Sequence, residues 1–188
     1  MTAFRELSQH ILDIAENSIN AGADLLFIDI REDFKADSLT IGIADNGRGM
    51  DKAMLQRVTD PWITTRTTRK VGLGIPFFKQ SAEMCEGSFG IQSEAGKGTK
   101  VVTVFQHSHI DRPPLGDLVG TLLCLIVGNP TVNFVYRHYV DDRAFILDSR
   151  EIRAILGDEV PLSDPEVLAF LRGMLEDGEH SLGGAPEG

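Results

Sequence analysis

The residues best suited to bind a ligand follow an apolar run, in the stretch Ile41-Gly-Ile-Ala-Asp-Asn-Gly-Arg-Gly-Met50. The run predicts a buried strand that ends at Asp45, and Gly47 and Gly49 let the backbone approach a ligand closely. An ionised carboxylate only accepts hydrogen bonds. At the bottom of an apolar pocket, Asp45 would select a flat base with an amino group, as in adenine, and repel the oxygen of guanine. The alternative is an ordinary turn between two elements.

A second set of polar side chains lies on the helix predicted from about residue 4 to residue 21. Asp13, Asn17 and Asn20 are spaced four and three residues apart, so they share one narrow stripe of that helix. A neighbouring stripe, which includes Leu7 and Ile11, is apolar and predicts the face that packs on the core. Long lysine and glutamate side chains are sparse on the polar stripe. This favours a face that lines a cleft over a face that is only solvated.

The third candidate segment is Thr64–Gly74, which has no periodicity and begins with four threonines, two arginines and a lysine. Its end, Gly72-Leu-Gly-Ile75, is predicted to open a helix, and the free N–H groups and dipole of a helix start form an anion site. Thr64, Thr65 and Arg66 could fold over this anion site and donate hydrogen bonds to phosphates bound there. The alternative is a flexible basic loop. No Walker A loop is present, and no G-x-G-x-x-G follows a strand.

These candidate residues require a sheet and helices to bring them together. Strands are predicted at residues 23–32 and 39–45, which pair across a polar turn, and at 88–93 and 99–107, which form a hairpin. Helices are predicted at 51–58, where Asp51 can form the cap, and from Gly72 to about residue 86.

Length and composition indicate a soluble globular protein with one domain of ordinary size, or one domain and a small appendage, in 188 residues. The net charge of −10 disfavours nucleic acid as a partner. Cys85 and Cys124 are predicted to be buried free thiols. The N-terminus lacks a signal-peptide pattern, and the longest apolar run is too short to span a bilayer. We therefore expect a cytoplasmic protein that does not bind membranes.

Four segments, taken in order, resemble the four sequence boxes of the GHKL ATP-binding superfamily. They are Asp13–Ala23, Asp45–Gly49, Gly72–Ile75 and Gly96–Thr99. This superfamily joins DNA gyrase, a heat-shock chaperone, histidine kinases and a DNA mismatch-repair protein. The segment Asp60–Arg66 is most similar to histidine kinases and anti-sigma-factor kinases, whereas the first helix resembles the mismatch-repair branch.

The resemblance covers about residues 5–107 and implies an α/β fold, a two-layer sandwich in which helices cover one face of a mixed sheet. By that likeness, Asn17 would hold Mg²⁺ against the phosphates of ATP, Asp45 would bind the adenine amine and Thr99 would support the adenine. The residues that the likeness and the patterns above assign to ATP binding are Asn17, Asn20, Asp45, Gly47, Gly49, Met50, Thr64, Thr65, Arg66, Gly72, Leu73, Gly74, Ile75 and Thr99.

Two departures from the superfamily pattern bear on turnover. The position of the catalytic glutamate, four residues before the metal asparagine, is Asp13, whose side chain is one methylene shorter. A general base must come within hydrogen-bond reach of its proton. Histidine kinases also carry a phosphoacceptor histidine on a long helical domain, and only about a dozen residues precede Asp13 here. We therefore expect binding of Mg-ATP without a self-contained histidine kinase.

The C-terminal region has no box of this kind. We expect residues 1–108 to form the ATP-binding domain, 109–178 a small α+β appendage, and 179–188 a disordered tail. The appendage is predicted to contain an apolar helix, a hairpin and two further helices. Phe134, Tyr136 and Tyr139 of the hairpin are expected to be exposed and to dock a partner; the alternative is that they pack on the ATP-binding domain.

Two functions remain open from the sequence. The first is an ATP-dependent regulatory subunit that changes the state of a partner protein without turnover. The second is an enzyme, either a protein kinase that phosphorylates serine, threonine or histidine, or a slow ATPase. Asp13 and the missing phosphoacceptor favour the first of these functions.

Overall fold

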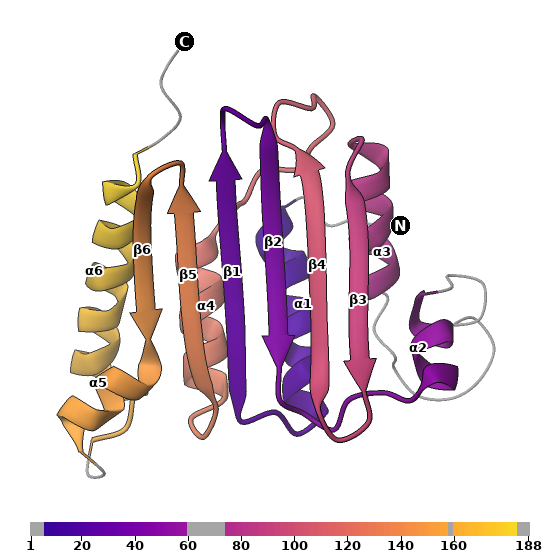
Figure 1. The fold of residues 1–188 in the computed structure, drawn as a ribbon. Coiled ribbons are helices and arrows are strands. Elements are labelled where there is room, and N and C mark those ends of the chain that lie inside the picture. The colour runs from indigo at the N-terminus through magenta and orange to yellow at the C-terminus, as the bar shows by residue number, and fades with distance from the viewer. Residues whose placement is uncertain (1–5, 60–73, 158–159, 184–188) are drawn as a thin grey trace.

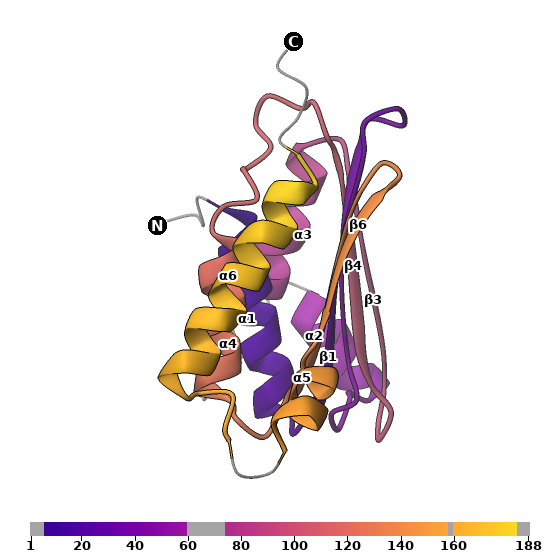
Figure 2. The same ribbon diagram turned by 90° about the vertical axis from the view of Figure 1, so that its left-hand side faces the viewer.

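The fold is a single sheet with helices packed on one face (Figures 1 and 2). The computed structural model describes residues 6–59, 74–157 and 160–183. Six strands lie in the order β3-β4-β2-β1-β5-β6. Their bounds are β1 Leu25–Asp33, β2 Ser38–Asp45, β3 Ser88–Glu94, β4 Gly98–Gln106, β5 Asn133–Val140 and β6 Arg143–Asp148. The helices are α1 Leu7–Asn20, α2 Lys52–Thr59, α3 Gly74–Met84, α4 Leu118–Gly128, α5 Ser149–Leu156 and α6 Pro165–Ser181.

The sheet is mixed, because one of its strand pairs is parallel. β1 pairs with β2, β2 with β4, β3 with β4 and β5 with β6 in antiparallel fashion. β5 lies parallel to β1, with Ile28 opposite Tyr136. A parallel neighbour requires a crossover, and the chain provides it as α4 between β4 and β5. The predicted two-layer α/β sandwich is confirmed.

Alternation along the strands explains why one sheet face is covered. Alternate residues of the central strands are fully buried, such as Ile28 on β1 and Ile41 on β2. Strand side chains point to opposite faces in turn, so these residues form one apolar face. The apolar stripe of α1, which includes Leu7 and Ile11, is buried against that face. The predicted core face of the first helix is therefore confirmed.

The C-terminal hairpin extends the N-terminal sheet. Phe134 and Tyr136 are 1% and 0% exposed, so the expectation that they form an exposed docking surface was wrong. The pairing of β5 with β1 turns their side chains to the face covered by the helices. Tyr139 lies on the opposite face of the sheet, where the guanidinium carbon of Arg31 is 4.7 Å from the centre of its ring.

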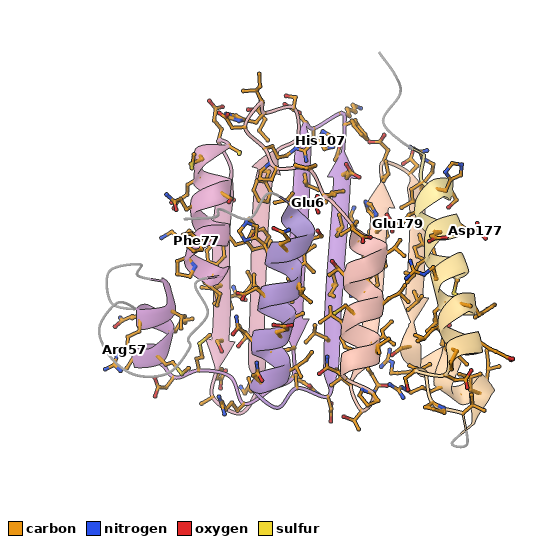
Figure 3. All side chains as sticks on the ribbon, turned by 180° about the vertical axis from the view of Figure 1, so that it is seen from behind. Glu6, Arg57, Phe77, His107, Asp177 and Glu179 are labelled. Carbon is orange, nitrogen blue, oxygen red and sulfur yellow. The ribbon has the colours of Figure 1, made fainter. Side chains whose placement is uncertain are left out.

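Two smaller expectations also change. Helix α6 continues to Ser181, so residues 179–181 are helical where a tail was expected, and Glu179 points from α6 into a hydrogen-bonded cluster (Figure 3). Cys85 is buried as predicted, whereas Cys124 is exposed. Among the described residues, no helix is both long enough and apolar enough to cross a membrane.

Candidate functional site

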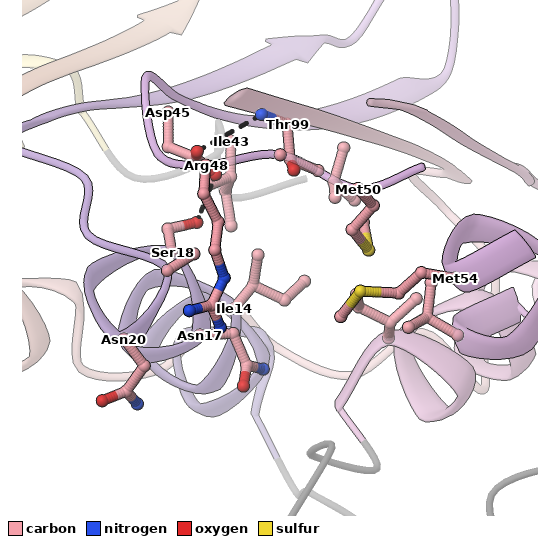
Figure 4. A pocket seen from close by; sticks show the side chains of 15 residues that line it. Ile14, Asn17, Ser18, Asn20, Ile43, Asp45, Arg48, Met50, Met54 and Thr99 are labelled. Carbon is pink, nitrogen blue, oxygen red and sulfur yellow. Dashed lines mark hydrogen bonds between the residues drawn. The ribbon is translucent and has the colours of Figure 1, made fainter. Parts of the chain in front are cut away.

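A cavity of about 460 Å³ lies between α1, the end of β2, α2 and the start of α3 (Figure 4). One part of its wall is apolar and includes Met50 and Met54, whose side chains point towards each other (Figure 4). The other part is polar and comes from α1 and the loop after β2. The lining residues are Ile14, Asn17, Ser18, Asn20, Ala21, Ile43, Asp45, Arg48, Gly49, Met50, Met54, Val58, Ile75, Thr99 and Val101.

Asp45 is held at the polar end of the apolar wall by three hydrogen bonds. Its Oδ1 accepts the backbone N–H groups of Gly47, at 2.8 Å, and Thr99, at 3.2 Å. Its Oδ2 accepts the Ser18 hydroxyl at 2.6 Å. A carboxylate has about four acceptor sites, so about one of them, on Oδ2, is left for a donor in the cavity. This geometry suits the amino group of a base.

Thr99 supplies a second acceptor beside Asp45. The Ser93 hydroxyl accepts the Met50 N–H at 2.8 Å and donates to the Gly98 carbonyl oxygen at 3.0 Å. Either hydroxyl can donate in the 2.9 Å contact between Thr99 Oγ1 and Ser93 Oγ, and Thr99 is the donor when the one Ser93 proton is given to Gly98. The Thr99 hydroxyl can then present only lone pairs to the cavity. Both groups at this end of the cavity therefore favour a ligand that donates hydrogen bonds.

Gly49 allows the loop after β2 to reach the cavity. It has a φ of +62°, and a side chain there would collide with the Glu94 carbonyl oxygen in the β3–β4 turn. The turn is tied to the same loop by a 2.7 Å bond from the Gly96 N–H to the Arg48 carbonyl oxygen. The glycines predicted from sequence thus bring two loops together beside the cavity.

The polar stripe of α1 does not line the cavity uniformly. Asn17 and Asn20 line it, but Asp13 does not. Asp13 Oδ2 accepts the Asn17 amide at 3.3 Å, and the Asp13 carboxylate also accepts the backbone N–H of Gly74, the first residue of α3. Burial and the charge of Glu16 raise the pKa of Asp13, and these two hydrogen bonds act in the opposite direction. Asp13 therefore links α1 to the start of α3.

The orientation of Asn17 fits a magnesium ion. Its amide nitrogen is used by Asp13, which leaves the carbonyl oxygen for the cavity. Magnesium prefers oxygen ligands and usually keeps several waters, so one side-chain oxygen and phosphate oxygens suffice to hold it. Asn17 would therefore supply one oxygen ligand to a magnesium ion in the cavity.

The structure brings together most of the site residues predicted from sequence. The cavity is lined by Asn17, Asn20, Asp45, Gly49, Met50, Ile75 and Thr99. The backbone N–H of Gly47 donates to Asp45, which lines the cavity, and that of Gly74 donates to Asp13, which does not. The other predicted site residues lie outside the described part of the chain; they are Thr64, Thr65, Arg66, Gly72 and Leu73.

Ser18 and Arg48 were missed by the sequence reasoning. Ser18 lies on the same stripe of α1 as Leu7 and Ile11 and is buried with them, but its hydroxyl holds Asp45. A polar residue on an otherwise apolar stripe was the signal that could have identified it. Arg48 stands between two predicted site glycines, and this position was the only sign in the sequence that it would line the cavity.

The sequence profile of one protein family, "Histidine kinase-, DNA gyrase B-, and HSP90-like ATPase", matches residues 3–109. The chain belongs to this family. The matched region of this histidine-kinase-like ATPase domain contains every described residue that lines the cavity. The predicted membership of the GHKL superfamily is therefore confirmed.

Two curated relatives are bacterial kinases. Sensor protein kinase FleS of Pseudomonas aeruginosa is 38% identical over 89 residues, which cover 47% of this chain and 22% of that protein. Sporulation kinase E of Bacillus subtilis is 32% identical over 96 residues, which cover 50% of this chain and 13% of that protein. The chain spans less than a quarter of the length of either relative.

A solved structure confirms the fold beyond the matched region. The N-terminal domain of a DNA repair protein aligns with 83% of this chain and 58% of its own, with a TM-score of 0.57 and 13% identity. At that identity the likeness shows the fold alone. Because it covers more of the chain than the family profile does, the alignment includes part of the region after residue 109.

Proposed function

We propose that this ATPase-family chain binds Mg-ATP in the cavity and acts as a nucleotide-dependent regulatory subunit on a partner protein. One observation carries the nucleotide assignment. Asp45 has about one free acceptor at the end of an apolar wall, in a cavity that Thr99 and the amides of Asn17 and Asn20 also line. Adenine would donate its amine to Asp45, and the phosphates would run towards Asn17 and the bound Mg²⁺.

Titration calorimetry with ATP and GTP, each with and without magnesium, tests this assignment. We expect ATP to bind more tightly than GTP, because the guanine oxygen would face the acceptor of Asp45. We also expect magnesium to strengthen ATP binding through the Asn17 carbonyl oxygen. Equal affinities for the two nucleotides would contradict the proposed base recognition.

The regulatory assignment rests on Asp13. Its carboxylate accepts hydrogen bonds from Asn17 and Gly74 and lies outside the lining of the cavity. A carboxylate used in this way is poorly placed to take a proton from water or an acceptor hydroxyl. We therefore expect the purified chain to bind ATP and hydrolyse it slowly or not at all.

A second candidate function, an active protein kinase or ATPase, is favoured by the names of the two kinase relatives. The Asp13→Glu variant, with Asp13→Asn as its control, separates the two functions in an ATP hydrolysis assay. If reach alone limits turnover, the glutamate variant gains activity and the asparagine variant does not. Brisk hydrolysis by the wild-type chain alone would favour the enzyme.

The partner is proposed to be a protein in the cytoplasm. The net charge of −10 disfavours nucleic acid, and both cysteines are free in the structure. Isolation of the native complex, followed by mass spectrometry of its components with and without ATP, would identify the partner. A chain that remains alone at physiological concentration in both conditions would contradict the regulatory proposal.

A further inference from the structure

Arg48 has a fixed backbone at the edge of the cavity. Its N–H donates to the Ala21 carbonyl oxygen at 3.0 Å, at the end of α1, and its carbonyl oxygen accepts the Gly96 N–H at 2.7 Å, in the β3–β4 turn. Gly49, which follows it, cannot carry a side chain without colliding with Glu94. Three separate segments therefore determine where the Arg48 side chain begins.

The Arg48 side chain brings a positive charge to the cavity. It is exposed and lines the cavity, and within residues 6–59, 74–157 and 160–183 it forms no ion pair. Other arginines of this acidic chain do form them, such as Arg137 with Asp29 and Arg150 with Asp148. Among the described residues that line the cavity, Arg48 alone carries a positive charge.

The Arg48 side chain extends from the Asp45 end of the cavity, where the base would bind, towards Asn17 on α1 (Figure 4). It begins three residues after Asp45, and Figure 4 shows its guanidinium directed towards Asn17. The only carboxylate that lines the described part of the cavity, Asp45, already accepts hydrogen bonds from Ser18, Gly47 and Thr99. The guanidinium therefore adds positive charge to the part of the cavity where Asn17 would face the phosphates.

We propose that Arg48 is a specificity-determining residue that binds the phosphate chain of the nucleotide. This inference rests on the proposed binding of ATP. A guanidinium is always charged, is planar, and offers paired donors that match phosphate oxygens. With Asp45 on the base and Arg48 on a phosphate, the loop after β2 would recognise both ends of an adenine nucleotide. Adenosine, which lacks phosphate, would gain nothing from Arg48.

The test compares Arg48→Met and Arg48→Lys with wild type by calorimetric titration of Mg-ATP, Mg-ADP and adenosine. Arg172→Met is the matched control, since Arg172 lies on α6 and pairs with Glu176. We expect Arg48→Met to reduce the affinity for ATP and for ADP about tenfold or more, because charged hydrogen bonds to phosphate are lost. Adenosine should bind as in wild type. Arg48→Lys should retain part of the affinity, and Arg172→Met all of it.

Three outcomes would overturn this proposal. If wild type binds ATP but Arg48→Met binds ATP and ADP within about twofold of wild type, Arg48 is not a phosphate ligand and the proposed function survives. If Arg48→Met reduces the affinity for adenosine as much as the affinity for ATP, Arg48 acts on the loop and not on phosphate. If wild type itself fails to bind ATP, both the proposed function and the role of Arg48 fail.

Discussion

At the scale of single residues, the sequence identified several groups that line the cavity but not the groups that hold them in place. Asp45 ends a buried strand and precedes two spaced glycines, so its position at the cavity was predictable. Ser18 holds its Oδ2 from α1, which is 27 positions earlier in the chain. Such a contact depends on how α1 packs on β2, and residue spacing within either segment does not contain that information.

Asp45→Asn is expected to weaken ATP binding by about 1–3 kcal/mol, the range for leaving a buried polar contact unmade. The Asn oxygen can still accept the N–H groups of Gly47 and Thr99, which turns the amide NH₂ towards Ser18 and the adenine amine. Titration calorimetry measures the loss. Asp51→Asn is the control, because Asp51 is exposed, caps α2 and can keep that role as asparagine. Unchanged ATP affinity in Asp45→Asn would remove Asp45 from the site.

Asn17→Ala is expected to abolish the magnesium dependence of ATP binding, because it removes the side-chain oxygen proposed to hold Mg²⁺. Titrations of ATP in magnesium and in EDTA measure this dependence for wild type and variant. In EDTA the two proteins should bind ATP about equally. If the variant keeps the wild-type response to magnesium, the metal is held elsewhere and Asn17 has no part in it.

At the scale of elements, local patterns predicted the strands and helices of the N-terminal region, because each one shows its own periodicity. The strand at 39–45 and the hairpin around residues 94–98 were predicted close to their observed bounds. The hairpin aromatics were misassigned because burial depends on which strand lies beside β5. Parallel pairing with β1, more than a hundred positions earlier, turned Phe134 and Tyr136 into the core.

The loop contact at Gly49 leads to a prediction on stability. Gly49→Ala should destabilise the protein more than Gly96→Ala does, although both glycines have positive φ values, +62° and +80°. A side chain at Gly96 would meet nothing within 4 Å, so its cost is the conformation alone, about 1–2 kcal/mol. A side chain at Gly49 would also press on the Glu94 carbonyl oxygen, which should add about 1–3 kcal/mol.

Urea unfolding of the two variants, compared with wild type, measures this difference. Similar losses at the two positions would show that the loop moves away from the β3–β4 turn at little cost. In that case the two loops would not form a rigid base for the ligand site. A larger loss for Gly49→Ala, with weaker ATP binding, would support the packed arrangement.

At the scale of the whole molecule, a partly buried chain of titratable groups connects the C-terminal region to the first strands. Glu32 on β1 contacts His107 at 2.7 Å and His138 on β5 at 3.1 Å. His138 Nδ1 lies 2.8 Å from Glu179 on α6, which also accepts the Tyr136 hydroxyl at 2.7 Å. These groups come from four distant parts of the sequence. The cluster could not be predicted without the order of the strands.

This cluster gives the protein a defined pH dependence. Burial alone would lower the pKa of His138, but hydrogen bonds and charges from Glu179 and Glu32 raise it from 6.5 to about 9. Its contribution to stability is therefore complete below about pH 6.5 and is lost as the pH rises through about 9.

His10 on α1, outside this cluster, acts on the acidic side. Burial lowers the pKa of His10 from 6.5 to about 4, so protonation of the unfolded chain removes stability as the pH falls between those values. Stability should be highest near neutral pH.

Glu179→Gln should remove most of the loss of stability on the alkaline side. Wild type should lose about 2–4 kcal/mol of unfolding free energy as the pH rises through about 9, because folding raises the pKa of His138 from 6.5 to about 9. The amide cannot stabilise protonated His138 by charge, so the variant should be less stable at pH 7 and change less between pH 7 and pH 10. Glu176→Gln, on the exposed face of the same helix, is the matched control and should follow the wild-type curve. Urea unfolding at each pH measures all three proteins. If Glu179→Gln keeps the full alkaline loss, His138 is not stabilised through α6, and the C-terminal helix must be held on the sheet by its apolar contacts alone.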